Sequence, residues 1–277
     1  MGTRRPTEVN LCLFFEGTGQ GVAGRFTNVT RLRDLCAASP HQKLHLEAGP
    51  GTHFGAYVGG KVIGSDWRAI FRSSRRWFEA NYQSLPPDAS GTSVFLFGFS
   101  RGALLARHFA SWLDKLGIGV EYLGLWDTVD ATAGLDVQET CPENVKKARH
   151  AVARDETRRF FAYVPIRGEK KRVVEMLFPG SHSDVGGLYD DNHLMADLAL
   201  AWIAAGAKRA GAKLKCGAPI AQGRIDVKRA VLHDSHMLVS NLWGAFDRVK
   251  RNFKGLVLHW RCRGIYGDGD KCGEKTR

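Results

Sequence analysis

The stretch VFLFGFSRGALLARHF, residues 94–109, decides the fold of this 277-residue chain. Its apolar run stops at Gly98, and a segment with helical spacing begins after Gly102. Between them, Gly98-Phe99-Ser100-Arg101-Gly102 matches the pattern G-x-S-x-G. A serine between two glycines, where a buried strand turns sharply into a helix, is typical of a nucleophile elbow. The stretch therefore predicts that Ser100 exposes its hydroxyl as a nucleophile.

A simpler explanation of the same residues is that Ser100 only caps the helix that follows. In the catalytic interpretation, the amides at the start of that helix, from Arg101 onward, point toward the serine and can bind an oxyanion. The loop Gly17-Thr18-Gly19 follows the first apolar run. It can bring a second backbone N–H, from Gly17 or Thr18, to the same oxyanion.

Short apolar runs alternate along the chain with segments of helical spacing, which predicts an α/β fold with a mostly parallel sheet and helices on both faces. After about residue 211 the pattern weakens, so we expect one domain over residues 1–277 with an irregular or edge-like part at 211–277. The expected strands, each followed by a loop, cover residues 11–19, 43–51, 93–102, 122–130 and 173–187. The expected helices cover residues 67–82, 103–116 and 194–210.

A serine nucleophile needs a histidine base and a carboxylate that orients the base. His182 lies in the glycine-rich loop FPGSHSDVGG after one expected strand, and Asp127 ends the strand in GLWDTVD. The carboxyl ends of parallel strands meet at one edge of a sheet, so both side chains can reach Ser100. We therefore predict a triad of Ser100, Asp127 and His182, with His182 Nε2 within hydrogen-bond reach of Ser100 Oγ.

Other residues compete for these roles. Asp184 is an alternative acid, or a residue that shapes the loop, and His236 or His233 is an alternative base. A metallohydrolase would instead gather four ligands: Glu16, Asp127, His182 and Asp184. Such an enzyme would not need the serine elbow, so we expect neither a metal nor another cofactor.

The net charge of +12 favours anionic partners, such as phospholipid head groups, nucleic acid or acidic proteins. The segments RSSRRW (72–77) and RVKRNFK (248–254) set basic residues beside aromatic ones, as a non-enzymatic nucleic-acid-binding protein would. Such clusters are more often solvated helix faces, and the sequence contains no recognised nucleic-acid module. We expect no nucleic-acid partner.

The first residues, MGTRRPTEVN, are polar, and the following LCLFF is too short for the core of a signal peptide. No apolar run approaches the roughly 20 residues that a membrane-spanning helix needs. We therefore expect a protein made in the cytoplasm without a cleavable leader.

Several motifs occur together in the order LFFEGTG, TNVTRL, GPGT, GFSRGALLAR, GLWDTVD, RHAVARDETRRFF and FPGSHSDVGGLY. Over about residues 9–205 the chain resembles the GFSRG-type lipase effectors of bacterial type VI secretion, which are α/β-hydrolases. Residue by residue, the resemblance implies Ser100 as nucleophile, Asp127 as acid and His182 as base. The chain departs from the family at Glu16, where aspartate is usual, and at Leu188, where glycine is common.

The resemblance implies a phospholipase of A1 or A2 type that is injected into rival bacteria to hydrolyse their membrane lipids. Its partners would be a phospholipid membrane surface, a component of the secretion machine and an immunity protein. The leading hypothesis is therefore a serine carboxylic ester hydrolase that acts on phospholipid. The alternatives are a serine esterase for a soluble ester or thioester, and the basic nucleic-acid-binding protein.

Overall fold

The computed structural model describes residues 8–20, 27–50, 57–58, 61–62, 66–84, 91–129, 138–158, 161–215 and 231–233. Its centre is a six-stranded sheet in the order β2-β1-β5-β6-β7-β8, and every neighbouring pair is parallel. The strands are β1 (Val9–Phe15), β2 (Gln42–Glu47), β5 (Thr92–Phe99), β6 (Tyr122–Trp126), β7 (Ala148–Ala153) and β8 (Val173–Phe178).

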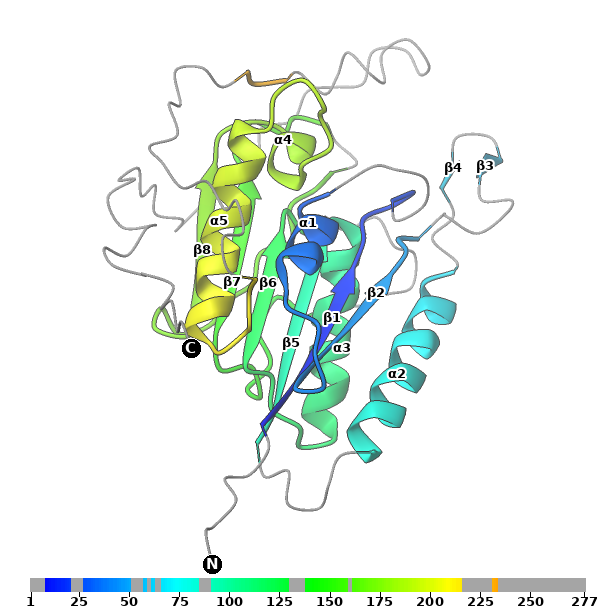
Figure 1. Cartoon of the computed structure of the whole chain (residues 1–277). Helices are drawn as coiled ribbons and strands as arrows, with labels where there is room; N and C mark the ends of the chain where they lie inside the picture. The colour runs from blue at the N-terminus through cyan, green and yellow to red at the C-terminus, as the bar shows by residue number, and fades with distance from the viewer. Residues whose placement is uncertain are drawn as a thin grey trace, which may run out of the picture.

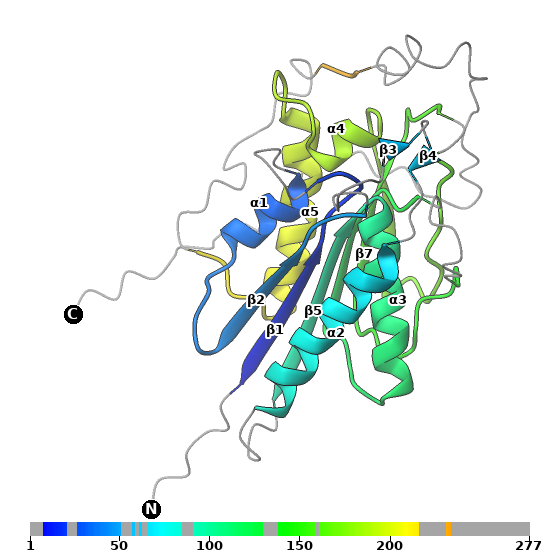
Figure 2. The ribbon, with the colours of Figure 1, turned by 90° about the vertical axis from the view of Figure 1, so that its right-hand side faces the viewer.

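Helices cover both faces of this sheet, as Figures 1 and 2 show. One face carries α1 (Asn28–Leu35) and α5 (Leu194–Arg209), and the other carries α2 (Trp67–Gln83) and α3 (Arg101–Lys115). The short helix α4 (His182–Gly186) lies near the carboxyl ends of the strands, at the top of Figure 1. A small hairpin pairs β3 (Tyr57–Val58) with β4 (Lys61–Val62). The predicted α/β class, with a parallel sheet between helices, is confirmed.

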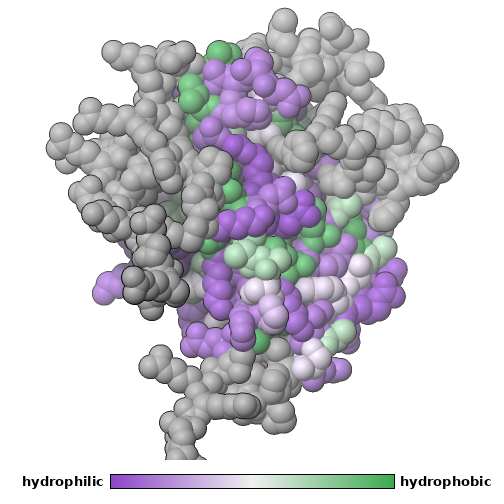
Figure 3. Space-filling model, viewed as in Figure 1, coloured by the Kyte–Doolittle hydropathy of each residue, from purple (hydrophilic) through white to green (hydrophobic). Residues whose placement is uncertain are grey.

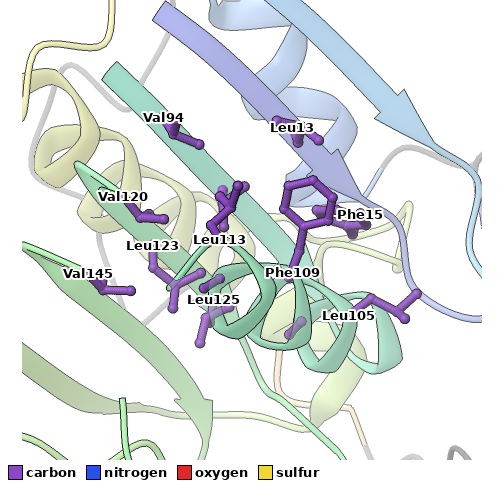
Figure 4. Packing of buried hydrophobic residues seen from close by; sticks show 14 of the residues in the cluster. Leu13, Phe15, Val94, Leu105, Phe109, Leu113, Val120, Leu123, Leu125 and Val145 are labelled. Atoms are coloured by element: carbon purple, nitrogen blue, oxygen red, sulfur yellow. The ribbon is translucent and has the colours of Figure 1, made fainter. Parts of the chain in front are cut away.

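The core has two layers because successive side chains of a strand point to opposite faces of the sheet. In β1, Leu11 and Leu13 belong to the layer shared with α2 and α3, whereas Cys12 and Phe14 belong to the layer shared with α1 and α5. Burying each large apolar side chain contributes about 1.5–3 kcal/mol. Figure 4 shows the first layer, in which α3 directs a stripe of apolar residues at the strands, namely Leu105, Phe109 and Leu113.

The surface in Figure 3 contrasts with this core. Where described residues form that face, hydrophilic side chains cover much of it and smaller hydrophobic areas lie between them. Among the described residues, no helix has both the length and the apolar character that crossing a bilayer requires.

The strand order reverses at β1, because the chain goes from β1 to β2 on one side and later returns to β5 on the other. Phe15 and Gly98 are register partners at the carboxyl ends of β1 and β5. The loop that begins at Glu16 therefore lies beside the corner at Ser100. A reversal of this kind is where open α/β sheets bind their ligands.

The structure adds elements that the spacing of apolar residues did not predict: β3, β4, β7, α1 and α4. Strand β7 was missed because it contains Arg149 and His150 between alanines, which does not look apolar. His150 is nevertheless fully buried, at 0% exposure. Beyond residue 210 the structure describes only 211–215 and 231–233, so the single domain and its irregular C-terminal part stay predictions.

Candidate active site

Ser100 stands at the corner between β5 and α3 in a strained conformation, with φ 58° and ψ −127°. The corner leaves no room for side chains beside it. A Cβ atom on Gly102 would lie 2.2 Å from the Phe15 carbonyl oxygen, and one on Gly98 would lie 2.5 Å from the Gly102 carbonyl oxygen. Backbone atoms cannot swing away as a side chain can, so both positions require glycine.

The hydroxyl of Ser100 makes no capping hydrogen bond to α3, so the explanation of this serine as a simple helix cap is wrong. Ser100 as a whole is 5% exposed, and the expectation of an exposed hydroxyl stays a prediction. The neighbouring β1 loop packs against the serine, because a Cβ atom on Gly17 would lie 3.3 Å from the Ser100 Cβ. The serine is therefore partly covered by the loop that follows β1.

Asp127 follows β6 directly and is completely buried, at 0% exposure. Its Oδ2 lies 2.6 Å from Nδ1 of His182, and its Oδ1 accepts the Ala153 N–H at 2.8 Å. Ser100 is tied to the same strand, because its N–H donates to the Trp126 carbonyl at 3.0 Å. The structure thus gathers Ser100, Asp127 and His182 at one edge of the sheet, and it pairs the acid and the base that the sequence predicted. The contact between Ser100 Oγ and His182 Nε2 stays a prediction.

Two aromatic rings enclose His182. The Phe99 ring stacks on the imidazole with centroids 4.5 Å apart, and the Phe161 ring meets it edge-on at 4.8 Å. Burial disfavours the imidazolium and lowers the pKa of His182 below the ordinary histidine value, although the hydrogen bond and charge of Asp127 oppose this shift. The imidazole is therefore neutral at neutral pH, which is the form that a general base needs.

Glu156 was not among the predicted site residues, yet its buried carboxylate accepts the His182 backbone N–H at 3.2 Å. The same carboxylate takes three hydrogen bonds from Arg158, through Nε, Nη2 and the backbone N–H. Burial opposes the charge on Glu156, but these bonds outweigh it and lower its pKa to about 2. The motif RHAVARDETRRFF contains both residues and was the available signal. This ion pair anchors the histidine loop.

Asp184, the alternative acid, binds Ser181 and His233 rather than the His182 ring. It closes a capping box at the start of α4, since its Oδ2 accepts the Ser181 N–H at 2.7 Å and the Ser181 hydroxyl at 2.9 Å. His233, an alternative base, occupies the other side of Asp184, with Nδ1 2.5 Å from Oδ1. Both residues thus hold the loop around His182. The remaining alternative base, His236, lies outside the described residues.

The two candidate oxyanion donors of the β1 loop differ in the structure. The Gly17 N–H points to the Glu16 carboxylate, 3.3 Å away. The Thr18 N–H has no hydrogen-bond acceptor within the described part of the chain. Arg101 is the first residue of α3 and directly follows Ser100. The amides of Thr18 and Arg101 are therefore the better pair of candidates.

The metal alternative fails on geometry. The buried Glu16 carboxylate is occupied by the hydroxyls of Thr27 and Thr30 and by the Thr30 N–H. Burial raises its pKa, against the effect of these hydrogen bonds. Asp184 is likewise engaged elsewhere, so the four proposed ligands do not converge. Among the described residues, no cluster of three or more potential ligands could hold a metal ion.

The protein family of this chain follows from a match to a family model. The model of the catalytic domain of Tle1-like phospholipase effectors of the type VI secretion system matches residues 9–120 and 118–206. The chain belongs to this family. The resemblance seen in the motifs, from LFFEGTG to FPGSHSDVGGLY, is therefore confirmed.

A solved structure with a TM-score above 0.5 is similar in fold to this family member. An uncharacterised protein from Pseudomonas aeruginosa is 21% identical, with a TM-score of 0.57 over 75% of this chain and 46% of that protein. A Tle1 effector bound to the VgrG spike of a type VI secretion system is 22% identical, with a TM-score of 0.49 over 68% of this chain and 52% of the effector. The chain thus spans about half the length of either. No curated protein sequence is significantly similar to it.

Proposed function

We propose that the chain is a serine-dependent carboxylic ester hydrolase, a phospholipase of A type, in which Ser100 is the nucleophile, His182 the base and Asp127 the acid. One observation carries the proposal: the 2.6 Å contact between Asp127 Oδ2 and His182 Nδ1, beside a strained serine corner. Ser100 Oγ attacks the ester carbonyl and passes its proton to Nε2 of His182. His182 then donates this proton to the departing lysophospholipid alcohol, leaving an acyl group on Ser100.

Water completes the reaction. His182 removes a proton from the water, and the resulting hydroxide attacks the acyl-serine ester. The fatty acid leaves, and the proton returns to Ser100 Oγ. Asp127 holds the tautomer of His182 that carries its proton on Nδ1 and stabilises the imidazolium between the two steps. No metal or cofactor is needed at any step.

The oxyanion of each tetrahedral intermediate needs preorganised donors. We assign this role to the N–H groups of Arg101, at the start of α3, and of Thr18, in the loop after β1. The position of Gly17 supports this assignment, because its Cβ site lies 3.3 Å from the Ser100 Cβ while its own N–H faces Glu16. The Gly17 N–H is thus engaged by Glu16, which leaves the Thr18 N–H as the candidate donor of this loop.

The substrate and the route are also proposals. The net charge of +12 favours a bilayer rich in anionic lipid, to which each basic residue near the surface contributes on the order of 1 kcal/mol. Membership of the Tle1-like family supports delivery into rival bacteria by a type VI secretion system after synthesis in the cytoplasm. The partners are then a membrane surface, a component of the secretion machine and an immunity protein, but no nucleic acid.

The direct experiment is mass spectrometry of a bacterial lipid extract incubated with the wild-type protein or with Ser100→Ala. The proposal predicts lysophospholipid and free fatty acid from the wild type alone. The acyl chain that is released identifies the A1 or A2 position. If a soluble ester is hydrolysed but the extract stays intact, the substrate is a soluble ester or thioester instead. Product from Ser100→Ala would contradict the serine mechanism.

A further inference from the structure

A second carboxylate–histidine pair lies behind Asp127, and the proposed mechanism does not use it. His150 on β7 and Glu175 on β8 are register partners. Nδ1 of His150 lies 2.9 Å from Oε1 of Glu175, and Nε2 of His150 lies 3.0 Å from the backbone nitrogen of Thr128. The imidazole therefore bridges Glu175 and the residue that directly follows the proposed catalytic acid.

The partners of His150 indicate which tautomer of its ring is present. A backbone N–H can only donate, so Nε2 facing Thr128 must be an unprotonated acceptor. The ring proton is therefore on Nδ1 and points at Glu175. Burial disfavours the charge on Glu175, but hydrogen bonds from His150, Tyr163 and the Ile166 N–H outweigh it and lower the pKa of Glu175. An ionised Glu175 thus keeps the Nδ1–H tautomer in place.

The Thr128 N–H belongs to the peptide group that determines where Asp127 points. Asp127 has φ 37°, in the left-handed region that residues other than glycine rarely adopt. Such a conformation persists only where neighbouring groups hold it. On one side the Asp127 N–H donates to the Ala151 carbonyl at 2.7 Å, and on the other His150 holds the Asp127–Thr128 peptide. Asp127, Thr128 and His150 are all 0% exposed, so water cannot replace this imidazole acceptor.

We propose that His150 is a positioning residue. By accepting the Thr128 N–H, it holds the peptide after Asp127 and so aims the Asp127 carboxylate at Nδ1 of His182. The inference rests on the proposed function, because it takes Asp127 as the acid of the triad. His150 does not contact the reacting atoms. Its effect on turnover passes through Thr128 and Asp127.

Two substitutions separate positioning from packing. The side-chain amide of His150→Gln extends to the place of Nε2, where its oxygen can accept the Thr128 N–H. The shorter amide of His150→Asn reaches only the place of Nδ1, so it can serve Glu175 but not Thr128. Both lose the ring and its stacking on Tyr163, whose centroid lies 5.8 Å away. They differ in which hydrogen bond survives.

The measurement is kcat and KM for a soluble ester, per active site titrated with a fluorophosphonate. We expect His150→Asn to lower kcat by on the order of tenfold or more with KM nearly unchanged, since a misaimed catalytic group slows the chemical step. His150→Gln should lose much less. Equal losses in kcat, or a larger loss in the Gln variant, would overturn the positioning role.

His45 offers a matched control on β2. It also pairs with a carboxylate, with Nε2 2.7 Å from Oε1 of Glu47, and stacks on the ring of Trp77 at 4.7 Å. The kcat values of His45→Gln and His45→Asn should be similar to each other, unlike those of the two His150 variants.

If Ser100→Ala still turns over ester, the proposed function itself fails. If Ser100→Ala is inactive but the two His150 variants are equal, only the positioning role fails.

A second measurement needs no variant and holds even if His150→Asn does not fold. Nitrogen NMR of the wild-type imidazoles at neutral pH should show His150 as the neutral tautomer with its proton on Nδ1. A proton on Nε2 would point at the Thr128 N–H and overturn the proposal.

Discussion

Oδ2 of Asp127 lies 2.6 Å from Nδ1 of His182, while Oδ1 of the same carboxylate accepts the Ala153 N–H at 2.8 Å. Each oxygen of the Asp127 carboxylate therefore has a partner, and the carboxylate cannot rotate without losing one of them. His182 is held in turn between the rings of Phe99 and Phe161. Asp127 and His182 are thus in a fixed relative orientation in the absence of substrate.

Replacing Asp127 tests its proposed role as the acid of the triad. Asp127→Asn keeps the shape but offers Nδ1 of His182 an amide, which favours the wrong tautomer. We expect kcat for a soluble ester to fall by about 10³–10⁴. Asp34→Asn is the control, because Asp34 is an exposed residue paired with Arg33, and it should match the wild type. More than a tenth of wild-type kcat in Asp127→Asn would show that another carboxylate orients the base.

The pH dependence of activity follows from the state of His182. In the proposed mechanism the neutral imidazole is the active form, and burial lowers its pKa below the ordinary value of 6.5. As the pH falls, the base is protonated and kcat/KM decreases, so the acid limb should have its midpoint below pH 6.5. A pH profile of kcat/KM with an uncharged soluble ester measures this. A midpoint above 6.5 would contradict the burial of the base.

The glycine after the serine corner is predicted to tolerate no side chain. A Cβ atom at Gly102 would lie 2.2 Å from the Phe15 carbonyl oxygen and 2.3 Å from that of Glu16. We expect Gly102→Ala to cost about 1–3 kcal/mol in the free energy of unfolding, measured with urea, and to abolish most of the activity. Gly119→Ala is the control, since its nearest neighbour would be 4.0 Å away. Wild-type stability in Gly102→Ala would refute the tight corner.

Chelation separates the serine mechanism from a metal mechanism. Backbone amides stabilise the oxyanion in a serine triad, so dialysis against EDTA should leave turnover of a soluble ester unchanged. Loss of activity that zinc or calcium restores would favour a metal site. Such a site would require Glu16 and Asp184 to leave the partners that now occupy them, which are Thr27, Thr30, Ser181 and His233.

The sequence predicted the elements whose signals are local. The corner at Ser100 could be predicted because an apolar strand, two glycines and an amphipathic helix are adjacent in the sequence. The proximity of Asp127 and His182 could be predicted because each follows an apolar run, and the carboxyl ends of parallel strands lie at the same edge of the sheet. These signals depend on residues that are close in the chain.

Other features depend on partners that are distant in the chain and so left no local signal. Strand β7 was missed because it contains the polar residue His150. Its imidazole can be buried because it forms a hydrogen bond with Glu175, 25 residues later in the chain. The Gly17 loop, which packs against Ser100, follows a different strand. Glu156 accepts a hydrogen bond from the His182 backbone, 26 residues later in the chain, and this contact forms only in the folded protein. Each of these three features could be identified only from the three-dimensional structure.

The central claim is that Ser100 is a nucleophile activated by the His182–Asp127 pair. It is tested most directly by intact-protein and peptide mass spectrometry after treatment with a fluorophosphonate probe. The proposal predicts one covalent adduct, on Ser100, in the wild type, much slower labelling in Asp127→Asn, and no adduct in Ser100→Ala. An unlabelled wild type that nevertheless hydrolyses ester, or an adduct that persists in Ser100→Ala, would contradict it.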